Sequence, residues 1–374
     1  MSAATKPTLA SAARIREAAL EDYAQVAALH GRNDMNPKSR EEWLHLWVNN
    51  PVYKKLANWT IGWVAENANQ EIVGYIGNIP LSFEYKGREI LAASIHALMT
   101  DGPHRGSAGF LLRRFLNYKI PELMVTTTAN ANSAKLNHAF RQPRVPTGDW
   151  SRSVFWITNY QGFLVSVLKN KGLPRVLSYP ASAVLKLRDK LVNADSWTRR
   201  SRREIGTCSR FDERFDLFWE DLKCAYPERL LATRSREVLQ WHFKYALEQK
   251  RAWIVTADNG SGLLAYAIFC RQDNPEHALT RVRLVDFQAL TGDMEVLVAM
   301  LASGLIQCQK EGIHMLEAFG FRPEKQSVID RLAPHRRQFP NWWYFYKTVN
   351  KALGPELQNP AVWDPSHFDG DATL

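Results

Sequence analysis

Hydrophobic and polar positions in the first third of the chain predict a helix followed by antiparallel strands. Apolar side chains recur at helical spacing over residues 22–30, which indicates an amphipathic helix. Residues 61–66, 72–79 and 81–85 are rich in β-branched and aromatic residues and are separated by short polar turns. A further strand is expected at 90–100. These segments together predict an antiparallel meander.

The pattern then changes to one in which strands and helices alternate, and the second half repeats it in outline. A glycine-rich loop, a helix, the strand 123–128 and the helix 130–140 follow the meander. Two helices, a hairpin, a strand, a helix and a strand then recur, which suggests a duplicated unit. The expected elements of the second half are the helices 215–226 and 235–246, the hairpin 253–270, the strand 281–289, the helix 294–310 and the strand 315–318.

Length and patterning together predict a mixed α/β protein of two domains. The chain has 374 residues, which exceeds one domain of ordinary size. Small polar residues at 1–13 predict a flexible tail, and prolines with charged residues mark 161–206 as a connector that contains a helix at 181–191. The N-terminal domain is then 14–160 and the C-terminal domain 207–374.

Charge and composition narrow the class of partner without choosing one. Forty-eight Lys and Arg against 38 Asp and Glu give a net charge of +10, which favours nucleic acid, an acidic membrane surface or a polyphosphate cofactor. The longest apolar stretch, Val296–Ile306, is interrupted by Ser303 and Gly304, so no membrane span or signal peptide is expected. Four widely spaced cysteines indicate a reduced, cytoplasmic compartment and no metal site.

The loop between the strand 90–100 and the next helix has the composition of a phosphate site. Gly102, Gly106 and Gly109 let successive backbone amides turn toward one point, and a helix N-terminus adds partial positive charge. A plain strand-to-helix turn explains the same residues. The loop is neither a Walker loop nor a dinucleotide-binding fingerprint.

Asp101-Gly102-Pro103-His104-Arg105-Gly106 resembles the pyrophosphate loop of the GNAT acyltransferase superfamily, and Asn130 with Ser133 keeps a spacing found after that family's fifth strand. Two departures are Ala108 and Phe110, and we expect Phe110 to point into the core. The family's general-acid tyrosine is replaced by Asn137. The resemblance implies two GNAT-like domains, each a mostly antiparallel mixed sheet flanked by helices. It also implies an acyl-CoA site formed by Leu98, Met99, Thr100, Arg105, Gly106, Ser107, Ala108, Gly109, Asn130 and Ser133.

The second half has no equivalent loop. Thr291-Gly292-Asp293 stands in its place, and the Asp293 carboxylate would repel a diphosphate. The resemblance therefore implies a double-GNAT protein with a single cofactor site, in the N-terminal half.

The chemistry of acyl transfer to an amine requires a base that accepts a proton near neutral pH. The family often takes this base from the fourth strand, nine to eleven residues before the loop arginine, which corresponds here to His96 or Ser94. Because imidazole titrates near neutrality, His96 is the candidate base. The alternative is a histidine whose hydrogen bonds are satisfied within the sheet.

Acidic residues elsewhere admit structural and functional interpretations. Asp286 lies in an apolar strand, so we expect it to pair with an arginine such as Arg281 or Arg283, or else to belong to an acceptor cleft. The acids near the C-terminus are expected to be solvated, with binding of an aminosugar ammonium group as the alternative. They are Asp364, Asp369 and Asp371.

The expected function is transfer of an acyl group, acetyl above all, from acyl-CoA to an amine of a small polar acceptor such as an aminosugar or polysaccharide precursor. An acyl carrier protein is an alternative donor. Two other functions stay open. One is Fem-like aminoacyl transfer from tRNA, in which the glycine loop would be superfluous, and the other is a non-catalytic CoA- or ligand-binding protein. Nucleic-acid binding is not expected.

Overall fold

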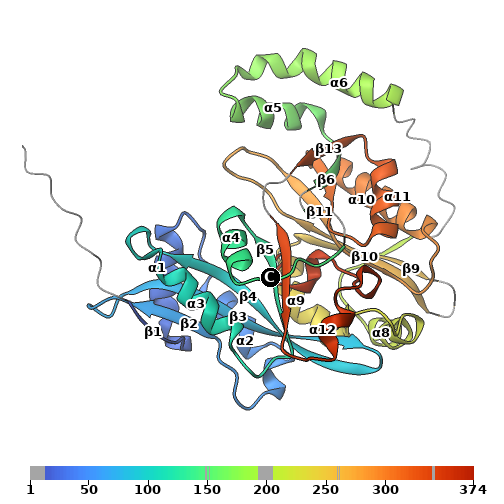
Figure 1. The fold of residues 1–374 in the computed structure, drawn as a ribbon. Helices are drawn as coiled ribbons and strands as arrows, with labels where there is room; N and C mark the ends of the chain where they lie inside the picture. Colours follow the sequence, from blue (N-terminus) through green and yellow to red (C-terminus); the bar gives the residue numbers. More distant parts are fainter. Residues whose placement is uncertain are drawn as a thin grey trace, which may run out of the picture.

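A computed structural model describes residues 13–147, 150, 152–192, 205–258, 260, 262–338 and 342–374 (Figure 1). The tail predicted at 1–13 lies outside these residues except for its last position. The described chain forms two sheets of seven strands each. In order across the first sheet, the strands are β1 (Arg14–Glu17), β2 (Gly62–Glu66), β3 (Ile72–Tyr85), β4 (Arg88–Thr100), β5 (Leu123–Ala129) and β14 (Trp343–Thr348), with β8 (Leu231–Ala232) paired to β3. Those of the second are β13 (His335–Gln338), β6 (Arg152–Ile157), β12 (Met315–Ala318), β11 (Arg281–Ala289), β10 (Leu263–Arg271), β9 (Ala252–Asp258) and β7 (Gly206–Cys208).

The two sheets share a central pattern of strand pairing. In the first sheet β2, β3 and β4 pair antiparallel, and β4 pairs parallel with β5. In the second sheet β9, β10 and β11 pair antiparallel, and β11 pairs parallel with β12. This repeat confirms the predicted mixed α/β fold with two similar halves.

Each sheet also contains a strand from the other part of the chain. The strand β6 precedes the predicted connector, yet it lies between β12 and β13 of the second sheet. The strand β14 comes from the end of the chain and pairs with β5 of the first sheet. The backbone hydrogen bonds therefore cross the expected boundary at residue 160, and the division into domains stays a prediction.

Helices cover the sheets and fill the connections between strands (Figure 1). Within the described residues no helix is long and apolar enough to span a membrane. The α-helices are α1 (Tyr23–Arg32), α2 (Arg40–Val48), α3 (Ser107–Leu116), α4 (Ala131–Ala139), α5 (Tyr160–Asn170), α6 (Ser178–Val192), α8 (Arg214–Ala225), α9 (Arg236–Glu248), α10 (Glu295–Lys310), α11 (Pro323–Leu332) and α12 (Leu353–Glu356). Short 3-10 helices are Leu20–Asp22, Tyr53–Lys55, Gly102–His104, Arg175–Leu177, Pro360–Val362 and His367–Asp369.

The strand β3 runs unbroken through Pro80, whereas the sequence pattern predicted two strands there. A proline lacks the N–H that a central strand donates, so it needs a free edge. On the side away from β4, β2 pairs with β3 only as far as Gly77, and β8 begins pairing at Phe83. The Pro80 carbonyl accepts a hydrogen bond from the Asn50 side chain on that side, at 2.9 Å. The proline therefore lies in a gap between two neighbouring strands.

Candidate active site where β4 and β5 separate

The parallel strands β4 and β5 pair over three residues only and then diverge. Ala92, Ala93 and Ser94 pair with Leu123–Val125, and no pairing follows among the described residues of the two strands. The register with β3 shifts just beyond, and Ala97 has a φ of +54°. This bulge redirects the strand, and His96 lies immediately before it.

The imidazole of His96 is buried but makes no hydrogen bond to the described residues. His96 is 8% exposed, and its Nδ1 lies 3.7 Å from Oδ2 of Asp371, beyond hydrogen-bond distance. The alternative interpretation, a histidine satisfied within the sheet, therefore lacks its hydrogen bond at Nδ1. The catalytic role of His96 stays a prediction.

The segment that brings Asp371 to His96 was expected to be solvated, and this expectation is wrong. Asp371 accepts hydrogen bonds from the hydroxyl groups of Thr127 and Thr128 on β5, at 3.2 and 3.0 Å. A Cβ added at Gly370 would lie 2.3 Å from Oγ1 of Thr127, so the segment approaches the strand as closely as glycine permits. The C-terminal segment therefore lies against β5, beside His96.

The other two acids of this segment are buried in ion pairs. Asp364 is 1% exposed and accepts a hydrogen bond from Lys325 at 2.7 Å. Asp369 is 2% exposed, and its Oδ1 lies 3.5 Å from Nη2 of Arg234. The hydropathy of the segment predicted exposed side chains for Asp364 and Asp369, because their cationic partners lie 39 and 135 positions away in sequence.

The N-terminus of α3 is open in the way that the phosphate-site prediction requires. Gly106 occupies the N-cap with no side-chain hydrogen bond, and the first turn carries no acidic residue. A Cβ at Gly106 or Gly109 would meet nothing within 4 Å, and neither residue has positive φ, so the fold itself does not demand glycine there. Asp101, the one acid of the loop, pairs with Arg32 at 2.9 Å. The Ala108 N–H donates to the Arg105 carbonyl at 3.2 Å, while the surface at Gly106 and Gly109 is open beside a neutralised carboxylate.

The prediction that Phe110 points into the core is wrong. Its side chain is 63% exposed. The buried residues of α3 are Leu111, Leu112, Phe115 and Leu116, which share one face of the helix, and Phe110 falls on the opposite face.

Asn130 and Ser133 begin α4. Asn130 Oδ1 accepts hydrogen bonds from the backbone N–H groups of Asn132 and Ser133, both at 3.0 Å. Of these two predicted cofactor residues, Asn130 is exposed and Ser133 is half-buried. Asn137 is 1% exposed and donates to the Ser133 carbonyl at 2.8 Å, while its Oδ1 accepts from Gln142. An amide held in this way supplies no acidic proton in place of the family's tyrosine.

Leu98, Met99 and Thr100 form the last part of β4 and lead directly into the loop. Met99 pairs with Tyr75, and Thr100 pairs with Gly74. Arg105 is exposed, as are Gly106 and the 3-10 turn residue Gly102, while Ser107, Ala108 and Gly109 are half-buried. The structure therefore places the predicted cofactor residues in two groups, one along β4 and α3 and one at the start of α4.

A nearby place in the second sheet holds Asp286, which pairs with an arginine as predicted, although not with Arg281 or Arg283. Arg234 donates to both oxygens of Asp286, at 2.9 and 3.0 Å, and the Tyr266 hydroxyl donates at 2.9 Å. Arg281 and Arg283 instead pair with Glu317. Burial alone would raise the pKa of Asp286, but Arg234 outweighs it and lowers that pKa. Asp286 is therefore a poor proton acceptor.

The N-terminus of α10 is closed by its own loop. The Asp293 carboxylate accepts a hydrogen bond from the Glu295 N–H at 2.9 Å, and Glu295 adds a second acid to the first turn. Acidic groups already occupy the positive end of this helix.

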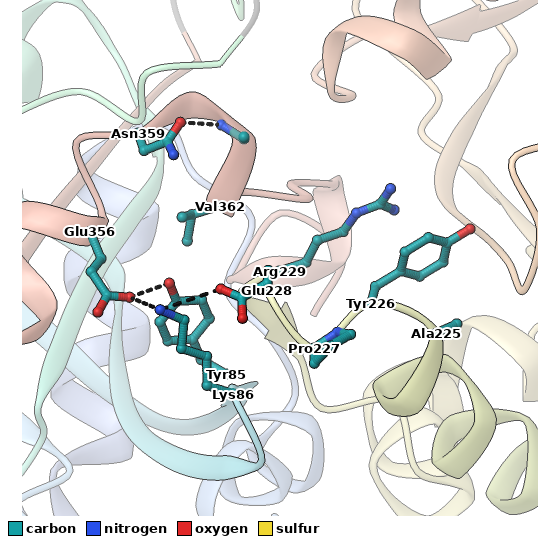
Figure 2. A pocket seen from close by; sticks show the side chains of 11 residues that line it. Tyr85, Lys86, Ala225, Tyr226, Pro227, Glu228, Arg229, Glu356, Asn359 and Val362 are labelled. Carbon is teal, nitrogen blue, oxygen red and sulfur yellow. Dashed lines mark hydrogen bonds and ion pairs between the residues drawn. The ribbon is translucent and has the colours of Figure 1, made fainter.

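Several pockets lie among the described residues, away from the β4–β5 opening. Figure 2 shows one of about 520 Å³ at the β3–β4 turn, where Lys86 pairs with Glu228 and Glu356 at 3.3 and 3.0 Å. A second, of about 300 Å³, is lined by Lys38, His45 and His242 and by 372–374, which directly follow Asp371. Only the second pocket adjoins the segment beside His96. Among the described residues no group of three His, Cys, Asp or Glu side chains is placed to hold a metal ion.

Solved structures resemble the chain over most of its length. A GCN5-related N-acetyltransferase from Kribbella flavida matches with a TM-score of 0.56 at 10% identity, over 92% of this chain and 73% of that one. A GCN5-related N-acetyltransferase from Anabaena variabilis matches with a TM-score of 0.52 at 11% identity, over 90% and 73%. The Saccharomyces cerevisiae N-myristoyltransferase with bound myristoyl-CoA matches with a TM-score of 0.55 at 11% identity, over 98% and 85%. No family model and no curated protein matches.

The chain therefore has the GNAT fold, present in two halves, as the loop resemblance predicted. At 10–11% identity the likeness establishes the fold, and function has to be argued from the site.

Proposed function

We propose that the chain is an N-acyltransferase that moves an acyl group, acetyl in the simplest case, from acyl-CoA to an amine of a small polar acceptor. The observation that supports this proposal is the continuity of one strand. His96, the segment Leu98–Thr100 and the open N-terminus of α3 follow one another along the chain, on the edge of β4 that β5 has left.

Donor binding in this proposal uses backbone more than side chains. The amides of Gly106, Ser107 and Gly109 donate to the diphosphate, and the exposed Arg105 guanidinium adds a charge-assisted contact. The backbone at Leu98–Thr100 holds the thioester end and polarises its carbonyl. In this proposal Asn130 and Ser133 contact the donor from the start of α4.

Proton transfer in this proposal centres on His96. Its imidazole accepts a proton as the amine nitrogen attacks the thioester carbonyl. The carbon–sulfur bond then breaks, and solvent protonates the released CoA thiolate, since Asn137 supplies no acid. In this proposal Asp371, whose Oδ2 lies 3.7 Å from Nδ1, helps to position the ring.

The pocket beside the C-terminal segment suits an acceptor that carries an anionic group. Lys38, Arg251 and Arg271 line it together with Glu42; Lys38 also donates to the Leu374 carbonyl at 2.7 Å, and Arg271 pairs with Asp273 at 2.8 Å. An aminosugar joined to phosphate has both the amine and the negative charge, so a polysaccharide precursor of this kind fits the pocket.

The test is a pair of measurements on His96→Gln, which keeps size and hydrogen bonding but removes basicity. Turnover of acetyl-CoA with a panel of phosphorylated aminosugars should fall by about 10²- to 10⁴-fold, while calorimetry should give nearly unchanged CoA affinity. A variant that turns over within a few-fold of the parent would exclude His96 as the base.

A second candidate is a CoA-binding protein without catalysis, favoured by the buried Asn137 in place of a general acid. It predicts tight acyl-CoA binding with no thioester cleavage for any amine. Calorimetry with acetyl-CoA, a long-chain acyl-CoA and charged tRNA separates these candidates from aminoacyl transfer.

A further inference from the structure

The helices α5 and α6 form a hairpin on the outside of the molecule (Figure 1, top). Its attachment to the second sheet is at the start of α5, where Gly162 packs so closely on His314 that a Cβ would lie 2.3 Å from the ring. His335 of β13 also reaches Asp189 of α6, at 2.7 Å. The hairpin is thus fixed along one side.

Polar side chains of α6 face α5 and the body of the protein. Ser178 and Ser182 bond to the amide of Gln161 on α5, at 2.7 and 3.1 Å. Asp189 accepts a hydrogen bond from the Tyr160 hydroxyl at 3.0 Å and is 6% exposed. Ser178, Ser182, Leu185 and Asp189 recur at helical spacing and form the inner face.

The outward face of α6 is apolar, the reverse of the usual arrangement. Val184, Leu187 and Leu191 are 69%, 60% and 78% exposed. Pro180 and Ala183 share their face by helical periodicity, and both are exposed. We call these five residues the α6 stripe. Four neighbours extend the apolar surface: Leu173, Val176, Leu177 and Tyr179.

Positive charges flank the α6 stripe on both sides. By helical periodicity Lys186 and Lys190 lie along one border and Arg188 along the other. The segment 160–191 holds six Lys and Arg residues, and its single acid, Asp189, is buried. An exposed apolar stripe bordered by cations, without exposed acids, is the pattern of helices that lie in the membrane interface.

We propose that the α5–α6 hairpin docks this protein on anionic lipid membranes. The α6 stripe enters the boundary between headgroups and acyl chains, while the flanking Lys and Arg side chains extend toward lipid phosphates. At 15 residues α6 lies along the surface and does not cross the bilayer. This proposal is independent of acyl transfer.

Co-sedimentation of the full chain with vesicles tests it. The protein should bind vesicles of equal parts phosphatidylcholine and phosphatidylglycerol, and bind phosphatidylcholine alone far more weakly. Val184→Ser/Leu187→Ser/Leu191→Ser should weaken binding at least about tenfold. Lys186→Gln/Arg188→Gln/Lys190→Gln should weaken it roughly a hundredfold at low salt.

The matched control removes exposed apolar side chains outside the hairpin. Leu217→Ser/Ile306→Ser changes residues of α8 and α10 that are 69% and 57% exposed, and it should bind vesicles like the parent. Equal binding by the serine triple variant and the parent, or no preference for phosphatidylglycerol, would overturn the proposal. So would light scattering that shows a dimer lost in the serine variant without vesicle binding, since a second copy would then cover the stripe. If the serine variant misfolds by circular dichroism, the glutamine variant decides.

Discussion

The two halves place different side chains just beyond the point where their parallel strands separate. His96 lies two residues beyond the last residue of β4 that pairs with β5, and Asp286 lies three residues beyond the last residue of β11 that pairs with β12. Nδ1 of His96 has no hydrogen bond among the described residues, whereas Asp286 is saturated by Arg234 and Tyr266. A repeated fold therefore supplies an opening between strands twice, and single residues decide whether the protein's own side chains fill it.

The helix that follows each strand repeats this contrast. The N-terminus of α3 has Gly106 at its cap and no acid in its first turn, and that of α10 has Asp293 bonded to its amide. A helix N-terminus attracts anionic groups, and at α10 the Asp293 carboxylate already binds there. Among the described residues of these two loops, the N-terminus of α3 is therefore more open to an anion than that of α10.

The C-terminal segment joins the two openings. Asp369 lies beside Arg234 of the second half, and two residues later Asp371 lies beside His96 of the first. The segment therefore runs from the ion pair of one half to the candidate base of the other, so substitutions in it test the comparison.

The largest effect is expected from Arg234→Met, which leaves Asp286 charged and unpaired in the core. Removing one member of a buried pair costs about 3–5 kcal/mol of unfolding free energy. Urea unfolding measures it. The double variant Arg234→Met/Asp286→Leu should recover most of the loss, and a single variant that loses under about 1 kcal/mol would contradict the structural role of the pair.

The next effect concerns the loops. Gly106→Val or Gly109→Val should weaken CoA binding at least about 100-fold, because a branched side chain blocks amides that donate to a charged ligand. Gly292→Val is the matched control in the second half, since a Cβ there also meets nothing within 4 Å. Calorimetry should show one site and no change for Gly292→Val. Two sites per chain would end the one-site interpretation.

Local sequence patterns correctly predicted those helices and strands whose periodicity and flanking turns can be recognised within the element itself. The strands β4 and β11 and the helix α10 follow directly from periodicity and turns, as does the order of elements that indicated the GNAT fold. Pro80 misled the assignment of β3 because its tolerance depends on where β2 and β8 stop pairing.

The candidate site was predictable only along one strand. His96 and the α3 loop are local features, but the contact of Thr127 with Asp371 spans 244 positions and that of Arg234 with Asp286 spans 52. Burial of Asp364 and Asp369 likewise depends on distant cations, so the local composition predicted exposed carboxylates instead. No pairwise signal in a single sequence connects such residues.

A smaller effect is expected in the pH dependence of stability. Burial, aided by the nearby Asp286 charge, raises the pKa of Asp369 to about 7 although Arg234 opposes it. The native state thus holds a proton that the unfolded chain releases near pH 4, so this stabilisation is complete at low pH and is lost as the pH rises toward 7.

Asp369→Asn should remove that slope, which amounts to at most about 1.4 kcal/mol per pH unit between pH 4 and 7. Urea unfolding of both proteins at several pH values measures it. Burial lowers the pKa of His242 and of His367 to about 3, which produces the opposite slope, but both proteins carry these residues and the difference isolates Asp369. Parallel curves for the two proteins would refute a raised pKa.

The smallest effect tests whether Asp371 acts through His96. Asp371→Asn retains the oxygen that accepts from Thr127 and Thr128 but removes the charge 3.7 Å from the imidazole. Acetyl-CoA turnover should fall about three- to tenfold with unchanged CoA affinity, because the carboxylate helps to position the candidate base without touching substrate. In the His96→Gln background the same substitution should cost nothing further, since a positioning residue has no effect once its target is gone. Equal losses in both backgrounds would show that Asp371 contributes to turnover by a route independent of His96.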